Sequence, residues 1–210
     1  MRQRGEKQPI IERFFVWPIK GISNYFWHIM DVWSYKNQRI AEHYNKAIAT
    51  EYKSEYESVG ISENSKILHI GCGPYPLTVI ELASLGKVKI VGIDKDPDAV
   101  RQARDVLKKK GLEKKVNIYE GDGSSYPVKP FDVIIVSTCS YPKASILEHI
   151  FTTAKPNTII IVRELHVASK DICRCIDKYP SIVILKQMHH DSFLLIAPIA
   201  WDAFYLKKTA

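Results

Sequence analysis

The fold of this 210-residue chain is decided by one stretch, Ile67-Leu68-His69-Ile70-Gly71-Cys72-Gly73-Pro74-Tyr75-Pro76. Its first half is an apolar run that ends in a glycine turn, which is typical of a fully buried parallel strand. Residues 77–83 are compatible with a helix, and Pro76 suits the first turn of a helix because its missing N–H costs little there. A strand, a glycine turn and a helix N-terminus together predict a binding site for a nucleotide-like ligand.

Composition gives no sign of an unusual protein class. Hydrophobic residues make up 46% and charged residues 25% of the chain, as in an ordinary globular protein. The net charge is +7, but its densest run, residues 108–115, lies at the end of a predicted helix, where lysines complement the helix dipole. We therefore do not favour a nucleic-acid partner. No apolar run reaches the roughly 18 residues of a membrane span.

The four cysteines have no zinc-ligand spacing, and the chain shows no signal peptide. We expect no metal and a cytoplasmic protein with reduced thiols. The cysteines are Cys72, Cys139, Cys173 and Cys175.

Residues 1–60 predict an N-terminal helical region that precedes a ligand-binding domain over residues 61–210. An aromatic-dense helical pattern covers 23–35, and a second helix is predicted over 37–59. Three interpretations stay open: packing against the sheet, covering the ligand site as a lid, or lying on a membrane or partner. Membrane binding is the weakest of these, because the polar faces carry acids as well as bases.

From residue 66 onward, strands and helices alternate. Strands are predicted over 66–71, 88–93, 116–119, 131–137 and 158–163, and helices over 76–85, 97–110, 143–154 and 169–177. Two further apolar runs, 181–186 and 192–198, have a short polar link and predict an antiparallel closing pair. The expected fold is α/β: a doubly wound, Rossmann-like, mostly parallel seven-stranded sheet with an antiparallel closing strand, preceded by N-terminal helices.

Acidic residues follow two of these strands, at the edge where ligands bind in such sheets. Asp94 follows the second strand and is suited to both hydroxyls of a ribose. Asp122 follows the third strand and is suited to an adenine amino group. Either aspartate alone could cap a turn or a helix. Together with the glycine turn, the two aspartates favour a ligand that carries an adenosine.

The turn itself distinguishes between two such ligands. A dinucleotide site requires a third glycine, but Pro76 stands at that position. We therefore predict S-adenosylmethionine as the cofactor, with NAD as a second choice. The expected cofactor-binding residues are Ile70, Gly71, Cys72, Gly73, Pro74, Asp94, Lys95, Gly121, Asp122, Gly123 and Ser137.

Over residues 60–200 the chain resembles the class I S-adenosylmethionine-dependent methyltransferase superfamily. The matching segments are His69-Ile70-Gly71-Cys72-Gly73, Gly92-Ile93-Asp94, Gly121-Asp122 and Phe131-Asp132-Val133-Ile134. The resemblance implies a Rossmann-like fold and this cofactor. It says little about the substrate, because the fold hosts many.

A narrower resemblance is to nicotianamine synthase and its archaeal relatives. Gly73-Pro74-Tyr75-Pro76-Leu77-Thr78 is similar to that family's Gly-Pro-x-Pro-Leu-Thr loop, and Tyr141-Pro142-Lys143 and Ile161-Val162-Arg163 also look alike. This resemblance implies transfer or cyclisation of the 3-amino-3-carboxypropyl group, with release of methylthioadenosine. The N-terminal region is short for that family, and its catalytic glutamate has no assigned counterpart here.

Displacement at a sulfonium carbon requires positioning more than acid–base chemistry, so a base is optional. Tyr141 follows the fourth strand and could hold an amine or a sulfonium through its hydroxyl or ring face. Tyr44 and Glu51 could reach down from a lid. Each of the three also has a plain structural interpretation, as a packed tyrosine or a solvated glutamate.

Two further features of the sequence remain: the histidines near the end of the chain, and the segment after the fourth strand. His166, and His189 and His190 in the expected closing turn, are interpreted as structural. Ser140-Tyr141-Pro142 differs from the Asn/Asp-Pro-Pro-Tyr motif of enzymes that methylate nucleic-acid amines.

The sequence therefore predicts a cytoplasmic S-adenosylmethionine-dependent transferase that acts on a small-molecule acceptor, with methyl transfer favoured. The first alternative is nicotianamine synthase-like chemistry. The second is a non-catalytic partner subunit that docks through its aromatic N-terminal face, and that face also leaves room for a homo-oligomer.

Overall fold

The computed structural model describes the backbone of residues 10–58, 61–62, 64–84, 86, 88–194 and 197–209. Within these it describes the side chains of 21–23, 25–46, 48–57, 61–62, 64–84, 86, 88–191 and 200–209. Residues 59 and 85, where two predicted helices were expected to end, lie outside the described residues.

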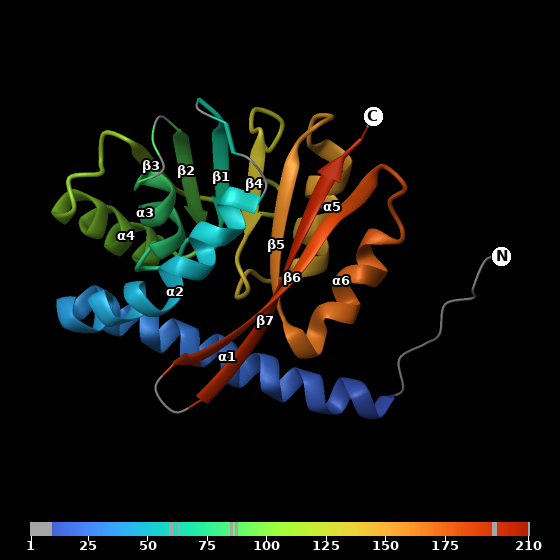
Figure 1. Ribbon diagram of the computed structural model, residues 1–210, viewed down its shortest axis with the longest axis horizontal. Helices are drawn as coiled ribbons and strands as arrows, with labels where there is room; N and C mark the ends of the chain where they lie inside the picture. Colours follow the sequence, from blue (N-terminus) through green and yellow to red (C-terminus); the bar gives the residue numbers. More distant parts are fainter. Residues whose placement is uncertain are drawn as a thin grey trace.

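One seven-stranded sheet organises the molecule, with the strand order β3-β2-β1-β4-β5-β7-β6 (Figure 1). The strands are β1 (Lys66–Ile70), β2 (Lys89–Asp94), β3 (Val116–Glu120), β4 (Val133–Val136), β5 (Ile159–Leu165), β6 (Ile182–Leu194) and β7 (Ala197–Lys208). β1 to β5 are parallel, and β7 runs antiparallel to both β5 and β6. The predicted doubly wound sheet with an antiparallel closing strand is confirmed.

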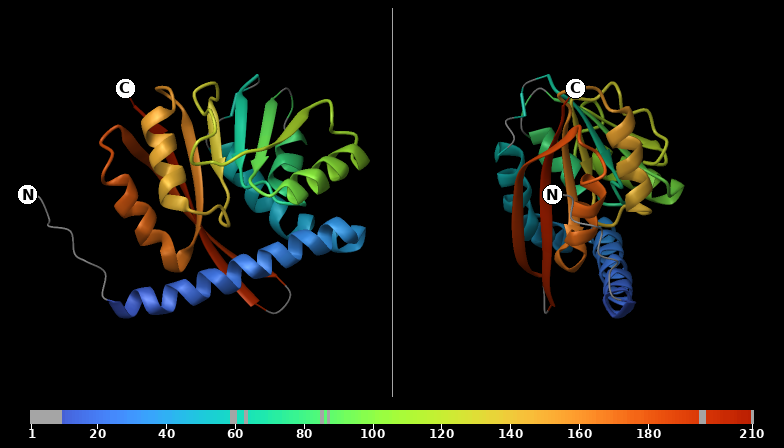
Figure 2. Two further views of the ribbon diagram at one scale, coloured as in Figure 1. Left: turned by 180° about the vertical axis from the view of Figure 1, so that it is seen from behind. Right: turned by 90° about the vertical axis from the view of Figure 1, so that its right-hand side faces the viewer.

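Helices cover both faces of this sheet (Figure 2). One hydrophobic cluster packs α5 (Lys143–Thr153) and α6 (Ser169–Ile176) on one face, and a second packs α3 (Leu77–Ser84) and α4 (Pro97–Lys109) on the other. A single 3-10 turn, η1 (His166–Ala168), joins β5 to α6. The inner strands are buried on both faces, which explains why β1 and β4 are continuous apolar runs.

The N-terminal region forms two helices, α1 (Ile10–Lys36) and α2 (Gln38–Ser58). The chain bends at Asn37, whose Oδ1 accepts a hydrogen bond from the N–H of Arg39 at 3.0 Å and so caps the start of α2. α2 packs on the sheet through buried Tyr56, while its buried Ile48 lies in a third hydrophobic cluster that also contains Met30 of α1. α1 lies across the carboxyl edge of the parallel strands (Figure 1). Among the described helices, none is both long and apolar enough to cross a membrane.

The predicted closing pair was placed wrongly along the chain. Residues 187–191 were expected to link two strands, with His189 and His190 in the turn, but they lie inside β6. β6 is an edge strand, so polar side chains along it reflect solvent exposure and not a turn. In the observed register His189 pairs with Asp202 and His190 with Trp201.

A buried ion pair ties α2 to the centre of the sheet. Arg163 on β5 and Glu55 on α2 have side chains that are 1% and 0% exposed, and their charged atoms approach to 2.8 Å. Arg163 also donates to Thr78 Oγ1 at 2.8 Å and to the Tyr56 hydroxyl at 3.1 Å. Its guanidinium lies 3.7 Å from the centre of the Tyr52 ring. Each end of the guanidinium is therefore satisfied within the protein.

Replacing Glu55 with Gln should lower the free energy of unfolding by about 3–5 kcal/mol, because a buried guanidinium loses its counter-charge. Urea unfolding followed by circular dichroism measures this. Glu57→Gln is the matched control on the same helix, since Glu57 contacts Lys53 only at 3.9 Å and both side chains are largely exposed. Equal unfolding midpoints for the two variants would contradict the structural role given to this pair.

Candidate functional site

A cavity of about 220 Å³ opens at the carboxyl ends of β1, β2 and β3. The turn after β1 lines one wall, Asp94 and Lys95 line a second, and residues 121–123 line a third. His28 and Asp31 of α1 line the side that faces away from the sheet. The cavity is therefore formed where ligands bind in open α/β sheets.

The turn after β1 depends on its two glycines. Gly71 has φ +77° and Gly73 has φ +66°, a backbone conformation that residues with a side chain rarely adopt. A Cβ on Gly71 would collide with Ser140 Oγ, and a Cβ on Gly73 would lie 2.7 Å from Asp31 Oδ2. Because Gly71 and Gly73 carry no side chain, a ligand in the cavity can approach the backbone of the turn closely.

Two carboxylates face this cavity from adjacent strand ends. Asp94 Oδ2 accepts a hydrogen bond from the N–H of Gly73 at 2.9 Å, and Oδ1 accepts one from Asp96 N at 3.1 Å. Asp122 accepts hydrogen bonds from the backbone N–H and the hydroxyl of Ser124, and these hold its pKa below the ordinary value. Both side chains are fixed acceptors for hydroxyl or amino groups of a ligand.

Most of the residues predicted to bind a cofactor line this one cavity. Those that do are Ile70, Gly71, Gly73, Pro74, Asp94, Lys95, Gly121, Asp122 and Gly123. Cys72 and Ser137 line a neighbouring cavity instead. Tyr141 lines the first cavity with a largely exposed side chain. Lys95, the residue directly after β2, donates a hydrogen bond to the Tyr141 carbonyl at 3.2 Å.

The neighbouring cavity is smaller, about 70 Å³, and largely aromatic. Its aromatic walls are Trp27 from α1, Tyr44 and Tyr52 from α2, Tyr75 from the turn, and Trp201 from β7. It shares Asp31, Gly71 and Cys139 with the first cavity. The two spaces therefore meet beside Asp31, between α1 and the carboxyl edge of the sheet.

Asp31 was not identified from the sequence. It is half-buried, and burial and the nearby Asp94 carboxylate raise its pKa well above the ordinary value, while a hydrogen bond with Tyr44 acts in the opposite direction. The only signal in the sequence is a lone acid within the aromatic pattern of residues 23–35. Its proximity to the turn depends on how α1 crosses the sheet, which no local pattern shows.

Two further polar side chains in or near the second cavity, His69 and Glu51, are engaged within the protein. His69 Nε2 lies 2.7 Å from Ser137 Oγ, and burial and the charge of Arg163 lower the pKa of His69 to about 3, so this ring is neutral. Glu51, predicted as a candidate catalytic residue, is bound instead by His190 Nδ1 at 2.6 Å. His190 stacks on Trp201 with ring centroids 5.0 Å apart. Glu51 therefore supports the Trp201 wall through His190.

Comparison with known proteins agrees with this geometry. Residues 61–195 match the family model described as a methyltransferase domain, so the chain belongs to that family. Membership implies use of S-adenosylmethionine, and one solved relative of the fold was crystallised with it.

Two solved structures share the fold of this chain, and one curated protein matches part of its sequence. The E81Q mutant of MtNAS in complex with S-adenosylmethionine superimposes with a TM-score of 0.68 and 18% identity, covering 95% of this chain and 77% of that one. A putative RNA methyltransferase from Pyrococcus horikoshii gives a TM-score of 0.61 and 18% identity, covering 77% of this chain and 83% of that one. An uncharacterized protein from Haemophilus influenzae is 25% identical over 120 residues. That match spans 53% of this chain and about half, 47%, of the curated relative.

Replacing Asp94 with Ala should weaken the binding of S-adenosylmethionine by about 1–3 kcal/mol, through loss of charged hydrogen bonds. Isothermal titration calorimetry on the purified chain measures the affinity. Asp98→Asn is the control, because Asp98 is an exposed residue of the same region that pairs with Arg101. An unchanged affinity in the Asp94 variant would show that this carboxylate does not contact the cofactor.

Proposed function

We propose that this protein is an S-adenosylmethionine-dependent transferase that acts on a small molecule, with methyl transfer as the first assignment. The observation that carries the proposal is the pair of cavities that meet beside Asp31. The first has the acids and glycines suited to an adenosine with a charged tail. The second is small, directly adjacent, and lined by both aromatic and polar side chains, which suits an acceptor that carries a polar nucleophile.

The residues of the first cavity fit the proposed cofactor. Asp94 would accept hydrogen bonds from the ribose hydroxyls and Asp122 from the adenine amino group. A Cβ on Gly123 would lie 2.5 Å from Ile70 Cγ2, so a side chain at this position would displace Ile70, which lines the same cavity. The glycine turn with Pro74 would lie along the methionine tail. When bound, the cofactor supplies an electrophilic sulfonium carbon.

In the second cavity the aromatic walls exclude water and restrict the acceptor to a small molecule. Tyr44 is buried, and its ring centroid lies 6.3 Å from that of Tyr75 and 6.0 Å from that of Trp27. Trp27 in turn contacts Trp201, with centroids 6.5 Å apart. Such a site orients the nucleophile and removes its hydration.

Asp31 is the group best placed to act on the acceptor. It lines both cavities, and its raised pKa brings it closer to the range in which a carboxylate accepts a proton from an amine or hydroxyl. Tyr44 would orient this carboxylate through their hydrogen bond. Tyr141 would contact the tail of the cofactor from the cavity mouth, and Glu51 would act only as a positioning residue.

A second candidate is transfer or cyclisation of the aminocarboxypropyl group. Two observations favour it: the Gly-Pro-x-Pro-Leu-Thr loop at residues 73–78, and the alignment of MtNAS with 95% of this chain, against 77% for the Pyrococcus horikoshii protein. The two reactions differ in which carbon on the sulfonium faces the second cavity.

The nucleoside product distinguishes the candidate reactions. The chain is incubated with S-adenosylmethionine and a panel of amines, hydroxyl compounds and amino acids, and the products are identified by mass spectrometry. S-adenosylhomocysteine would establish methyl transfer, and methylthioadenosine would establish aminocarboxypropyl chemistry. Failure to bind S-adenosylmethionine in calorimetry would overturn the proposal and leave the non-catalytic alternative.

Replacing Asp31 with Asn should lower kcat by about 10²–10⁴-fold, as expected for loss of a general base. In the wild type, the rate should fall as the pH drops through the raised pKa of Asp31, because protonation removes the base. The variant should lose this acidic limb of the pH–rate profile. Glu42→Gln, an exposed change on α2, serves as the control. A variant that keeps both its kcat and the acidic limb would exclude this role.

A further inference from the structure

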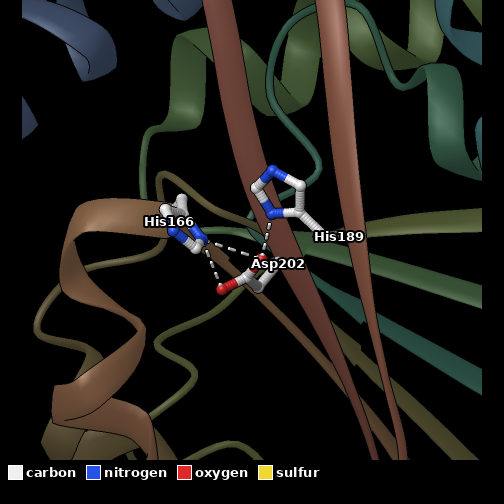
Figure 3. A group of neighbouring side chains, drawn as sticks. All are labelled: His166, His189 and Asp202. Atoms are coloured by element: carbon white, nitrogen blue, oxygen red, sulfur yellow. Dashed lines mark hydrogen bonds and ion pairs between the residues drawn. The ribbon is translucent and has the colours of Figure 1, made fainter.

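Three side chains converge beyond the end of β5, on the face of the sheet covered by α6 (Figure 3). His166 comes from η1, His189 from β6 and Asp202 from β7. His166 Nδ1 lies 3.1 and 3.0 Å from the two carboxylate oxygens, and His189 Nδ1 lies 2.6 Å from Asp202 Oδ1. The three potential ligand atoms all lie within 4.8 Å of one another.

This cluster is separate from the candidate active site. Neighbouring residues on a strand point to opposite faces, so His189 and Asp202 share one face while His190 and Trp201 share the other. Trp201 lines the acceptor cavity. Among the described residues that line the two cavities, none belongs to the cluster.

Hydrogen bonds from neighbouring residues orient the side chains of the cluster, as they do around metal ligands in proteins. Asp202 is 1% exposed, and its carboxylate also accepts hydrogen bonds from Ser169 Oγ and, at 3.3 Å, from Gln187 Nε2. These donors fix its orientation. The second ring nitrogen of His189, Nε2, lies 3.2 Å from Asp191 Oδ1. A carboxylate on the outer nitrogen of a histidine is the usual support of a metal-ligating imidazole.

We propose that His166, His189 and Asp202 form a binding site for a divalent transition-metal ion, with Zn²⁺ as the reference ion. Two imidazole nitrogens and one carboxylate oxygen are a donor set that such ions prefer, and a water molecule would complete the coordination. The side chains of His166 and His189 are 58% and 43% exposed, which leaves an open path to solvent.

For the two histidine–carboxylate contacts, metal binding requires only a small rearrangement. Tetrahedral bonds of about 2.0–2.2 Å separate neighbouring ligand atoms by a little more than 3 Å. The present N···O distances of 2.6–3.1 Å are those of hydrogen bonds, so the ligands would move apart by a few tenths of an ångström. Each imidazole would then carry its proton on Nε2, and in His189 that proton would face Asp191.

The position of the site indicates what the ion would do. It connects the end of β5 to both strands of the β6–β7 hairpin, through η1. Trp201, which forms a wall of the acceptor cavity, is adjacent to Asp202 on β7. An ion at this site would therefore hold the hairpin against the sheet and fix that wall from the opposite face.

Calorimetric titration of the chelator-treated full chain with Zn²⁺ tests the proposal. We expect one ion per chain. His166→Gln and His189→Gln should each weaken binding by more than tenfold, and Asp191→Asn should weaken it by about tenfold while the stoichiometry stays at one. His43→Gln removes an exposed histidine of α2 and should leave the affinity unchanged. Affinity for S-adenosylmethionine and thermal melting, measured on each variant, report whether the fold is intact.

Titration with Co²⁺ on the wild-type chain gives a test that needs no variant. Visible absorption bands of a low-symmetry Co²⁺ site with nitrogen and oxygen ligands would support the proposal. A thiolate charge-transfer band would place the ion on cysteine and overturn it. Absence of Zn²⁺ binding, or an affinity that neither histidine variant changes, would also overturn it.

Discussion

The buried ion pair between Arg163 and Glu55 is the interaction on which the arrangement of the site depends. Removing two charges from water is costly, and such a pair is tolerated only when its remaining hydrogen-bonding groups are satisfied. Thr78, Tyr56 and the ring of Tyr52 do this for Arg163. The pair fixes α2 against β5. α1 then packs beside α2 in a hydrophobic cluster that contains Met30, Ile48 and Trp201, and this packing places it across the carboxyl edge of the sheet.

The two cavities divide the proposed chemistry between the sheet and the helices. The parallel strands supply the fixed acceptors at their carboxyl ends, where peptide groups and glycine turns allow close approach of a ligand. The N-terminal helices supply Asp31 and three of the five aromatic wall residues, and the turn after β1 and strand β7 supply the other two. α2 contributes Tyr56 to the hydrophobic core. Both helices also line the second cavity, so a lid role for the N-terminal region stays a prediction.

The sequence predicted the features that depend on local residue patterns. It also predicted the residues that gather at the edge where the parallel strands end. Continuous apolar runs marked β1 and β4, and Asp94 and Asp122 follow strands whose ends meet by topology. Asp31 was missed because its position depends on the packing of a helix distant in sequence from the turn. The position of the β6–β7 hairpin was predicted wrongly. A run of polar residues is expected both in a turn and along a solvent-exposed edge strand, so the sequence did not distinguish the two. The cluster of His166, His189 and Asp202 was not predicted, because it depends on the register between strands. The sequence of a single strand does not specify that register.

The register of β6 has a consequence for how this protein can change. His189 and His190 are adjacent in sequence, yet they face opposite layers of the molecule. A single residue inserted or deleted between Lys186 and His189 would exchange the two faces, because side chains alternate along a strand. It would break the contact with Asp202 and the stacking on Trp201 at once. The irregular pairing between Ile184 and Lys186 absorbs a mismatch ahead of this point, so length variation is tolerated there and not beyond it.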